Sequence, residues 1–497
     1  MGKVLKNSVS SIVRVILVTP IFFILIPYTI SKIGTEGYGV WALTGIISSY
    51  QSFVNMGLTG ALIRYVAISN VNQDKSALSE YLGTSFWAYF LLSVVVGIVI
   101  FIFQDFIITR ILNIKIDITT SRILLISTFI ASAINMISGL FKSTIDGLQR
   151  MDVSNLILLL QVVISAVGTF VFLEIGCGLL GLAYNLVITS ILSFLGNVYS
   201  AKVISGFNFR GFVFKISRLK EMFSYSVNLQ LGSIVRAGIE PMNKVLLSHF
   251  FSMEHVAYYD IAWKFSVKLG GLVNAALTPI LPASTEIYEK HGVEKLELFR
   301  KKVSVYILSF ITPLYVIILV VLSAFVALWI GYSNNEIVIS IVIFLIASFI
   351  SSITIPGYFI LNGSGFANDT FKVQLFGTVC NVIVIFLGIE LIGFYGFAIG
   401  FFAAQVLNFF MTYKFYSNRI LNEKGVYKLF CFPRLLLSNL AIAILGFIIV
   451  NVFMVDTYWE LVLVASLLLV VYLALLRHAK VISPEDIPNV GFLKMFR

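Results

Sequence analysis

Long apolar segments follow one another along almost the whole chain, and they constrain its fold more than any other feature. We count about fourteen of them, each close to the roughly 20 residues that a helix needs to cross a bilayer. Hydrophobic residues make up 59% of the 497 residues and charged residues only 12%. A soluble protein of this size cannot bury so much apolar surface. The sequence therefore predicts an all-α polytopic membrane protein of about fourteen transmembrane helices.

The basic residues of the loops indicate the orientation of the chain, because cytoplasmic loops of membrane proteins are rich in Lys and Arg. The first segment has no small-residue cleavage site, so we expect it to stay as the first span, with Lys3 and Lys6 inside. The odd-numbered connections then hold few cations, namely Lys32, Arg110, Lys115 and Arg122. We expect both termini in the cytoplasm, and we attribute most of the net charge of +11 to this topology rather than to a nucleic-acid surface.

The loops lack the motifs of several other function classes. They are too short for a folded soluble domain, and the phosphate-binding pattern fails because Phe141 precedes Lys142 where a glycine is needed. The scattered cysteines Cys177, Cys380 and Cys431 have no metal-ligand spacing. The histidines lie at span ends or in loops, which leaves no embedded relay. We expect neither a metal nor a cofactor.

Ordered landmarks recur along the chain and indicate an internal duplication. Ser-Ile-Val-Arg occurs at residues 11–14 and again at 233–236, and the glycine-rich stretch 178–183 matches 393–398. An even number of spans per unit gives two parallel repeats, related by an axis along the membrane normal. We predict two six-helix bundles and two additional helices, over residues 1–220, 221–420 and 421–497.

Several stretches resemble a known group of transporters. IGTEGYGVWAL, FVNMGLTGALIRYVA, LNGSGFANDTFKV and GFYGFAIG are similar to segments of Wzx-type polysaccharide repeat-unit exporters. These belong to the multidrug/oligosaccharidyl-lipid/polysaccharide exporter superfamily. The resemblance implies a MATE-like fold, and a flippase that moves an undecaprenyl-pyrophosphate-linked oligosaccharide across the bacterial inner membrane. It also implies the membrane lipids as partners, a polysaccharide polymerase or chain-length protein as a possible partner, and a role in O-antigen, capsule or exopolysaccharide synthesis.

Charged residues inside two neighbouring segments are the best candidates for a binding site. A charge at the bilayer centre costs roughly 3 kcal/mol, so it should face a cavity or a partner. Arg236, Glu240 and Lys244 share one helical stripe, and Asp260, Lys264 and Lys268 share another. Together with a deep Arg14 they leave a positive balance, which suits a pyrophosphate in a central cavity. The candidate substrate-binding residues are Arg14, Arg236, Lys244, Lys264 and Lys268.

Two other interpretations of these charges stay open. The two stripes are also consistent with a structural salt-bridge ladder between neighbouring helices, and Arg14 is also consistent with snorkelling to the cytoplasmic face. The embedded carboxylates are candidates for ion coupling, although a Lys four residues away from Glu240 and from Asp260 favours plain ion pairs. The coupling candidates are Glu240, Asp260 and Asp146. Pro20 and Pro241 are hinge candidates or tolerated kinks.

Three function classes compete, and the flippase fits best. A cation or drug antiporter of the same superfamily is the alternative, but it should have a carboxylate-rich lumen. A membrane-embedded polysaccharide polymerase is less favoured, because such enzymes commonly need a long external loop and the external loops here are short. We therefore expect a transporter that works by alternating access, and not an enzyme.

Overall fold

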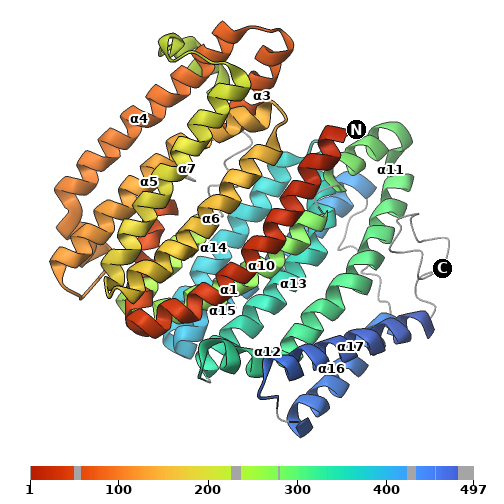
Figure 1. Ribbon diagram of the computed structural model, residues 1–497. Helices are drawn as coiled ribbons and strands as arrows, with labels where there is room; N and C mark the ends of the chain where they lie inside the picture. The colour runs from red at the N-terminus through yellow and green to blue at the C-terminus, as the bar shows by residue number, and fades with distance from the viewer. Residues whose placement is uncertain are drawn as a thin grey trace. The chain divides into compact units, whose positions relative to one another are not determined.

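The computed structural model describes residues 2–49, 58–224, 237–277, 280–332, 334–422, 433–453 and 455–478. Throughout these ranges the chain is almost entirely helical and has no β-strand (Figure 1). Nine of the described segments are long and apolar enough to cross a membrane, and two shorter apolar helices cover Leu58–Val71 and Leu437–Val450. The prediction of an all-α polytopic membrane fold is confirmed. The described chain divides into two compact units, Met1–Asp260 and Ile261–Arg497.

The first unit is a bundle in which helices far apart in the sequence lie side by side. Helix α5 packs against α3, α4 and α7, and α6 packs against both α7 and α1 (Figure 1). Its elements are α1 (Gly2–Thr44), η1 (Gly45–Ser49), α3 (Leu58–Val71), α4 (Lys75–Phe106), η2 (Ile107–Ile111), α5 (Ile118–Gly147), α6 (Met151–Glu174), α7 (Gly178–Ser205), η3 (Phe209–Gly211), α9 (Ile239–Phe250) and the start of α10 (Met253–Leu277).

Polar side chains hold this bundle together at helix crossings. The amide of Asn135 donates to Ser190 Oγ at 2.9 Å, and that of Asn185 donates to Thr169 Oγ1 at 3.0 Å. A Cβ on Gly168 would lie 2.0 Å from Asn185 Oδ1, so the Asn185 side chain fits here because residue 168 has none. Lipid offers no hydrophobic drive for helix association, so such bonds, worth about 0.6–2 kcal/mol each, and close packing must supply it.

The second unit repeats the packing order of the first. Helix α13 packs against α11, α12 and α15, and α14 packs against α15, as α5 does with α3, α4 and α7 and α6 with α7. Beyond α10, its elements are α11 (Ile280–Tyr306), η4 (Ile307–Ile311), α12 (Thr312–Ile330), α13 (Asn335–Gly363), α14 (Ala367–Ile392), η5 (Gly393–Tyr395), α15 (Gly396–Tyr416), η6 (Ser417–Leu421), α16 (Pro433–Phe453) and α17 (Tyr458–His478).

The last two helices have no counterpart among the described residues of the first unit. Helices α16 and α17 lie against each other and against α12 (Figure 1). Their contact is an apolar cluster that includes Val321 of α12, Ile442 of α16 and Leu468 of α17. The predicted boundary at residue 420 stays a prediction. The predicted boundary at residue 220 also stays a prediction. The first compact unit extends beyond it and includes α9, which contacts α1 and η1, and the start of α10.

Candidate functional site

A break in α1 turns its last part toward the start of α10. Gly34 has φ 74° and ψ 167°, a conformation that interrupts the helix and that favours glycine. Five residues later, Gly39 meets the backbone of Met253 so closely that a Cβ would lie 1.8 Å from the carbonyl oxygen. Glycine at these two positions therefore lets residues 35–44 pack directly on α10.

A buried ion cluster lies at this contact. We define the Lys244 cluster as Tyr38, Glu240, Lys244 and Asp260. The ammonium group of Lys244 lies 2.7 Å from Asp260 Oδ1 and 2.6 Å from Glu240 Oε1. The hydroxyl of Tyr38 donates to the other oxygen of Asp260, Oδ2, at 2.8 Å. The cluster thus joins α1, α9 and α10.

Burial and charge define what the Lys244 cluster can do. The side chain of Asp260 is 0% exposed and that of Lys244 is 5% exposed, whereas Glu240 is 35% exposed. Removing two charges from solvent is costly, so each depends on its partner. Two carboxylates face one ammonium, which gives the three charged groups a formal balance of −1. Glu240 is the most exposed of these three charged side chains.

Further contacts fix α9 against its neighbours. The amide of Asn243 donates to the hydroxyl of Tyr259 at 2.9 Å, and the amide of Asn113 donates to the carbonyl oxygen of Ser248 at 2.6 Å. The ring of His249 places Nδ1 2.9 Å from Val245 O and Nε2 2.9 Å from Arg110 O. The end of α9 is therefore tied to η2 and to the loop after it.

The predicted cations fall in different surroundings. Lys244 is compensated by two carboxylates. On α10, Lys264 is one turn beyond Asp260 and half-buried, and Lys268 is two turns beyond it and exposed. Arg236 lies outside the described residues. Arg14 is half-buried on α1, and no described residue forms an ion pair with it. Their role in substrate binding stays a prediction.

The depth of Arg14 follows from the way α1 lies along α6. Asn155 Nδ2 donates to Ser10 Oγ at 2.9 Å near one end, and Lys32 Nζ lies 2.9 Å from Glu174 near the other, so the two helices run parallel. Arg14 is one turn beyond Ser10, which places it about 12 Å from the start of α6. At this level Arg14 lies beside the membrane span Met151–Glu174 of α6.

The remaining candidates have more local contacts. Asp146 is nearly buried and accepts from Lys142 Nζ and Ser154 Oγ, both at 2.5 Å, so its carboxylate holds α5 to α6. The helical dihedrals of α1 continue through Pro20, and the interruption falls at Gly34 instead. Pro241 lies in the first turn of α9, where a helix needs no N–H donor from it.

Sequence reasoning missed Tyr38 as a member of the site. Tyr38 lies in the stretch IGTEGYGVWAL, which carries part of the resemblance to the exporters. A glycine on each side of Tyr38 was a usable signal, because glycines in a helix often mark a close backbone approach. The contacts of Asn113 and His249 gave no comparable signal.

Comparisons with known proteins agree on one group. The sequence profile of a family described as polysaccharide biosynthesis protein matches residues 4–288. A putative O-antigen transporter of Shigella flexneri is 19% identical over 284 residues, covering 57% of this chain and 67% of that protein. A probable flippase, AglR, of Haloferax volcanii is 22% identical over 284 residues, covering 54% of this chain and 52% of that protein.

Solved structures of the same fold include transporters of two kinds. The lipid II flippase MurJ, in an inward closed conformation, matches with a TM-score of 0.72 at 14% identity, covering 94% of this chain and 97% of that one. A multidrug resistance MATE family transporter of the MOP superfamily, in an inward-facing conformation, matches with a TM-score of 0.70 at 18% identity, covering 81% and 94%. At these identities the likeness concerns the fold.

Proposed function

Because the chain belongs to the polysaccharide biosynthesis protein family, we propose that it moves an undecaprenyl-pyrophosphate-linked oligosaccharide repeat unit across the bacterial inner membrane. It is a multi-pass membrane protein of the MOP superfamily and a flippase for lipid-linked substrates in general. The named relatives are transporters and flippases, not enzymes. The product would serve O-antigen, capsule or exopolysaccharide synthesis, with a polymerase or chain-length protein downstream and both termini in the cytoplasm.

The observation that carries this proposal is the family match over residues 4–288, which includes the whole Lys244 cluster. The putative O-antigen transporter and the lipid II flippase support a lipid-linked glycan as the substrate class. A pyrophosphate is an anion that arginine's planar fork binds well. We propose that Arg14, Arg236, Lys264 and Lys268 meet this anion, and that Lys244 joins them only when its cluster opens.

We propose that the Lys244 cluster closes the external end of the transport path. Tyr38 belongs to the first predicted repeat, and its partner Asp260 belongs to the second. The predicted orientation places the connection before Tyr38, and the one after η2, outside the membrane. Alternating access by rocking of the repeats must separate such groups. Loss of the Tyr38–Asp260 bond would then accompany opening toward the outside.

Reconstitution tests the proposed activity directly. The purified chain is placed in vesicles with a lipid-linked oligosaccharide, and an impermeant glycosidase reports how much glycan faces outward. We expect the digested fraction to rise from about one half, the share in the outer leaflet, toward completion, because flipping delivers the protected pool. Vesicles with the Arg14→Ala variant should digest their inner pool more slowly. An inner pool that stays protected in vesicles holding the wild-type chain would refute the flippase.

A cation or drug antiporter is the second candidate, because one observation favours it. Two carboxylates share one ammonium in the Lys244 cluster, and Glu240 is partly exposed. Protonation of either carboxylate would remove one partner of Lys244 and weaken the proposed closure. The test imposes a proton or sodium gradient on vesicles that hold wild type or Glu240→Gln. A gradient-driven flux of glycan lipid that Glu240→Gln loses supports a coupled flippase, and a drug flux without glycan movement supports the antiporter.

A further inference from the structure

The segment that follows α7 is bound along the first turns of α4. We call residues 206–224 the connecting segment. The indole of Trp87 donates to Phe212 O at 3.0 Å, and the hydroxyl of Thr84 donates to Val213 O at 3.2 Å. A Cβ on Gly83 would lie 2.4 Å from Phe212 Cα, so the two backbones touch. The connecting segment therefore has a defined place on the bundle.

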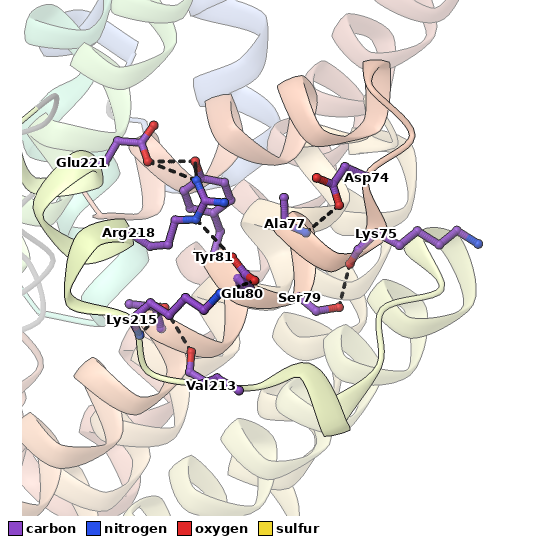
Figure 2. Close-up of polar contacts among 11 residues, drawn as sticks. Asp74, Lys75, Ala77, Ser79, Glu80, Tyr81, Val213, Lys215, Arg218 and Glu221 are labelled. Atoms are coloured by element: carbon purple, nitrogen blue, oxygen red, sulfur yellow. Dashed lines mark hydrogen bonds and ion pairs between the residues drawn. The ribbon is translucent and has the colours of Figure 1, made fainter.

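Ion pairs on the inner side of the connecting segment compensate the carboxylates of Glu80 and Glu221. Glu80 of α4 pairs with Lys215 and, at 3.2 Å, with Arg218 (Figure 2). Glu221 accepts from the hydroxyl of Tyr81 at 2.9 Å, and the guanidinium of Arg218 lies 4.5 Å from the Tyr81 ring centroid. These contacts turn two basic side chains toward the protein and neutralise both carboxylates.

The outer side of the connecting segment is apolar and aromatic. Its exposed large hydrophobic side chains are Phe209, Val213, Phe214, Ile216 and Phe223. Trp87, whose indole is bonded to the segment, is itself 37% exposed. Aromatic rings with a polar atom are typical of the level where lipid headgroups meet the hydrocarbon. Because Trp87 lies about 18 Å from the start of α4, the apolar row sits where that helix passes from polar to apolar sequence.

Three cations next to this apolar row have no acidic partner in the part of the chain that the structure describes. Lys202, Arg210 and Lys220 are exposed, and no carboxylate of the described residues pairs with them. The ammonium of Lys202 lies 5.6 Å from the Phe209 ring centroid, beside the apolar row. Uncompensated cations that flank exposed aromatic side chains match an anionic membrane surface, where each Lys or Arg strengthens binding.

We propose that the connecting segment lies in the headgroup region of the membrane and binds the phosphate groups of anionic phospholipids through Lys202, Arg210 and Lys220. The apolar row enters the lipid, and the inner ion pairs keep the segment on α4. A membrane occupant is favoured over a soluble protein, because the cations and the aromatic row occur together at the end of a membrane span. The inference is independent of the substrate that the protein moves.

The test compares two variants that each remove one Arg and one Lys. Full-length protein is incorporated into nanodiscs of equal phosphatidylglycerol and phosphatidylcholine, and native mass spectrometry counts the lipids that stay bound after release. Wild type should retain phosphatidylglycerol in preference. Arg210→Gln/Lys220→Gln should reduce that preference about tenfold. Arg110→Gln/Lys115→Gln, on exposed residues beyond the far end of α4 and outside the connecting segment, should keep it.

A second measurement locates the apolar row. Phe214→Trp should be quenched by brominated lipids beyond the background of the native tryptophans, and both double variants should unfold at the wild-type temperature in detergent. Equal retention of the two lipids by wild type overturns the proposal. So does an unchanged preference in Arg210→Gln/Lys220→Gln, which would mean that the anionic lipid binds elsewhere. Absence of added quenching would place the segment outside the membrane and leave a soluble partner as its occupant.

Discussion

Two oxygens of one buried carboxylate connect three helices at the residue scale. Asp260 accepts a hydrogen bond from Tyr38 and an ion pair from Lys244, and it is shielded completely from solvent. An unsatisfied group at such a place costs more than the bond itself, because its desolvation is no longer offset. The hydroxyl of Tyr38 is therefore the part of the cluster whose removal is easiest to interpret.

Tyr38→Phe should lower the free energy of unfolding by about 1–3 kcal/mol, because it leaves an oxygen of Asp260 without this donor. Tyr28→Phe is the matched control on the same helix. Its hydroxyl donates to Glu174 at 2.8 Å, but that carboxylate is 60% exposed and water can replace the donor. Thermal unfolding in detergent should show a lower midpoint for Tyr38→Phe alone. Equal midpoints for the two variants would show that the hydroxyl of Tyr38 does not stabilise the cluster.

Arg14 allows a test of charge against shape in substrate binding. Arg14→Ala should slow glycan-lipid movement at least tenfold, since a lost charge-assisted contact is worth about 1.5–3 kcal/mol. Arg14→Lys should keep part of the rate, because an ammonium still attracts phosphate but lacks the planar fork. The vesicle digestion described above measures both. Wild-type rates in both variants would mean that Arg14 only snorkels to the cytoplasmic face.

At the element scale, the contact between α1 and α10 depends on Gly39. Gly39→Ala should separate residues 35–44 from α10, because its Cβ would overlap Met253 O. We expect a lower unfolding midpoint and faster alkylation of a cysteine placed at Val40, which is 0% exposed. Gly45→Ala, with nothing within 4 Å of its Cβ, is the control. Unchanged alkylation in Gly39→Ala would show that the contact is not tight.

The start of α5 supplies a prediction with a defined pH dependence. Asp117 accepts from the backbone N–H of Thr120 at 2.8 Å, and this bond holds the pKa of its carboxyl below the ordinary 3.8. Its stabilisation is therefore present above that ordinary value and is lost as the pH falls through the lower folded-state pKa. Asp117→Ala should unfold at a lower temperature than wild type at pH 7, and the difference should close at pH 2. A constant difference would exclude the charge as its cause.

The length of the apolar segments predicted the helices well. It predicted less well which side chains contact one another. The apolar segments predicted as spans form long helices, as α5 (Ile118–Gly147) does. The pairing of Glu240 with Lys244 follows from their spacing of four residues and was one of the interpretations considered. The bond from Tyr38 could not be predicted, because an uncharged residue inside an apolar segment carries no signal of its partner. The need for glycine at position 39 becomes clear only in the structure, where the backbone of Met253 lies against it.

The two units share one plan at the scale of the whole molecule. In each unit, one long helix (α5 or α13) packs with the second helix after it and with the two helices before it. This order is the one expected of the parallel repeats predicted from recurring landmarks, since duplicated segments should fold alike. The added pair α16 and α17 covers α12 and leaves that plan intact.

A cross-link at the end of α9 tests whether this contact must open during transport. Asn113 and Ser248 touch but lie outside the Lys244 cluster. In a chain whose three native cysteines are serine, Asn113→Cys/Ser248→Cys treated with a short bis-methanethiosulfonate, which joins the two thiols through disulfides, should stop glycan-lipid movement. Reduction should restore it, and each single variant should be unaffected by the reagent. Full transport in the cross-linked protein would show that this end stays closed throughout the cycle.

The hydrogen bond between Tyr38 and Asp260 can form only after a delay during synthesis of the chain. The two residues are 222 positions apart along the chain. At roughly 5–20 residues per second, the ribosome needs about 11 to 44 s between them. During that interval the surface of α1 around Gly39 is already in the membrane but lacks its native contact with Met253. The first unit therefore finishes folding only after the second repeat has begun to emerge, and a fragment ending at residue 220 would keep this surface open to the insertion machinery or to lipid.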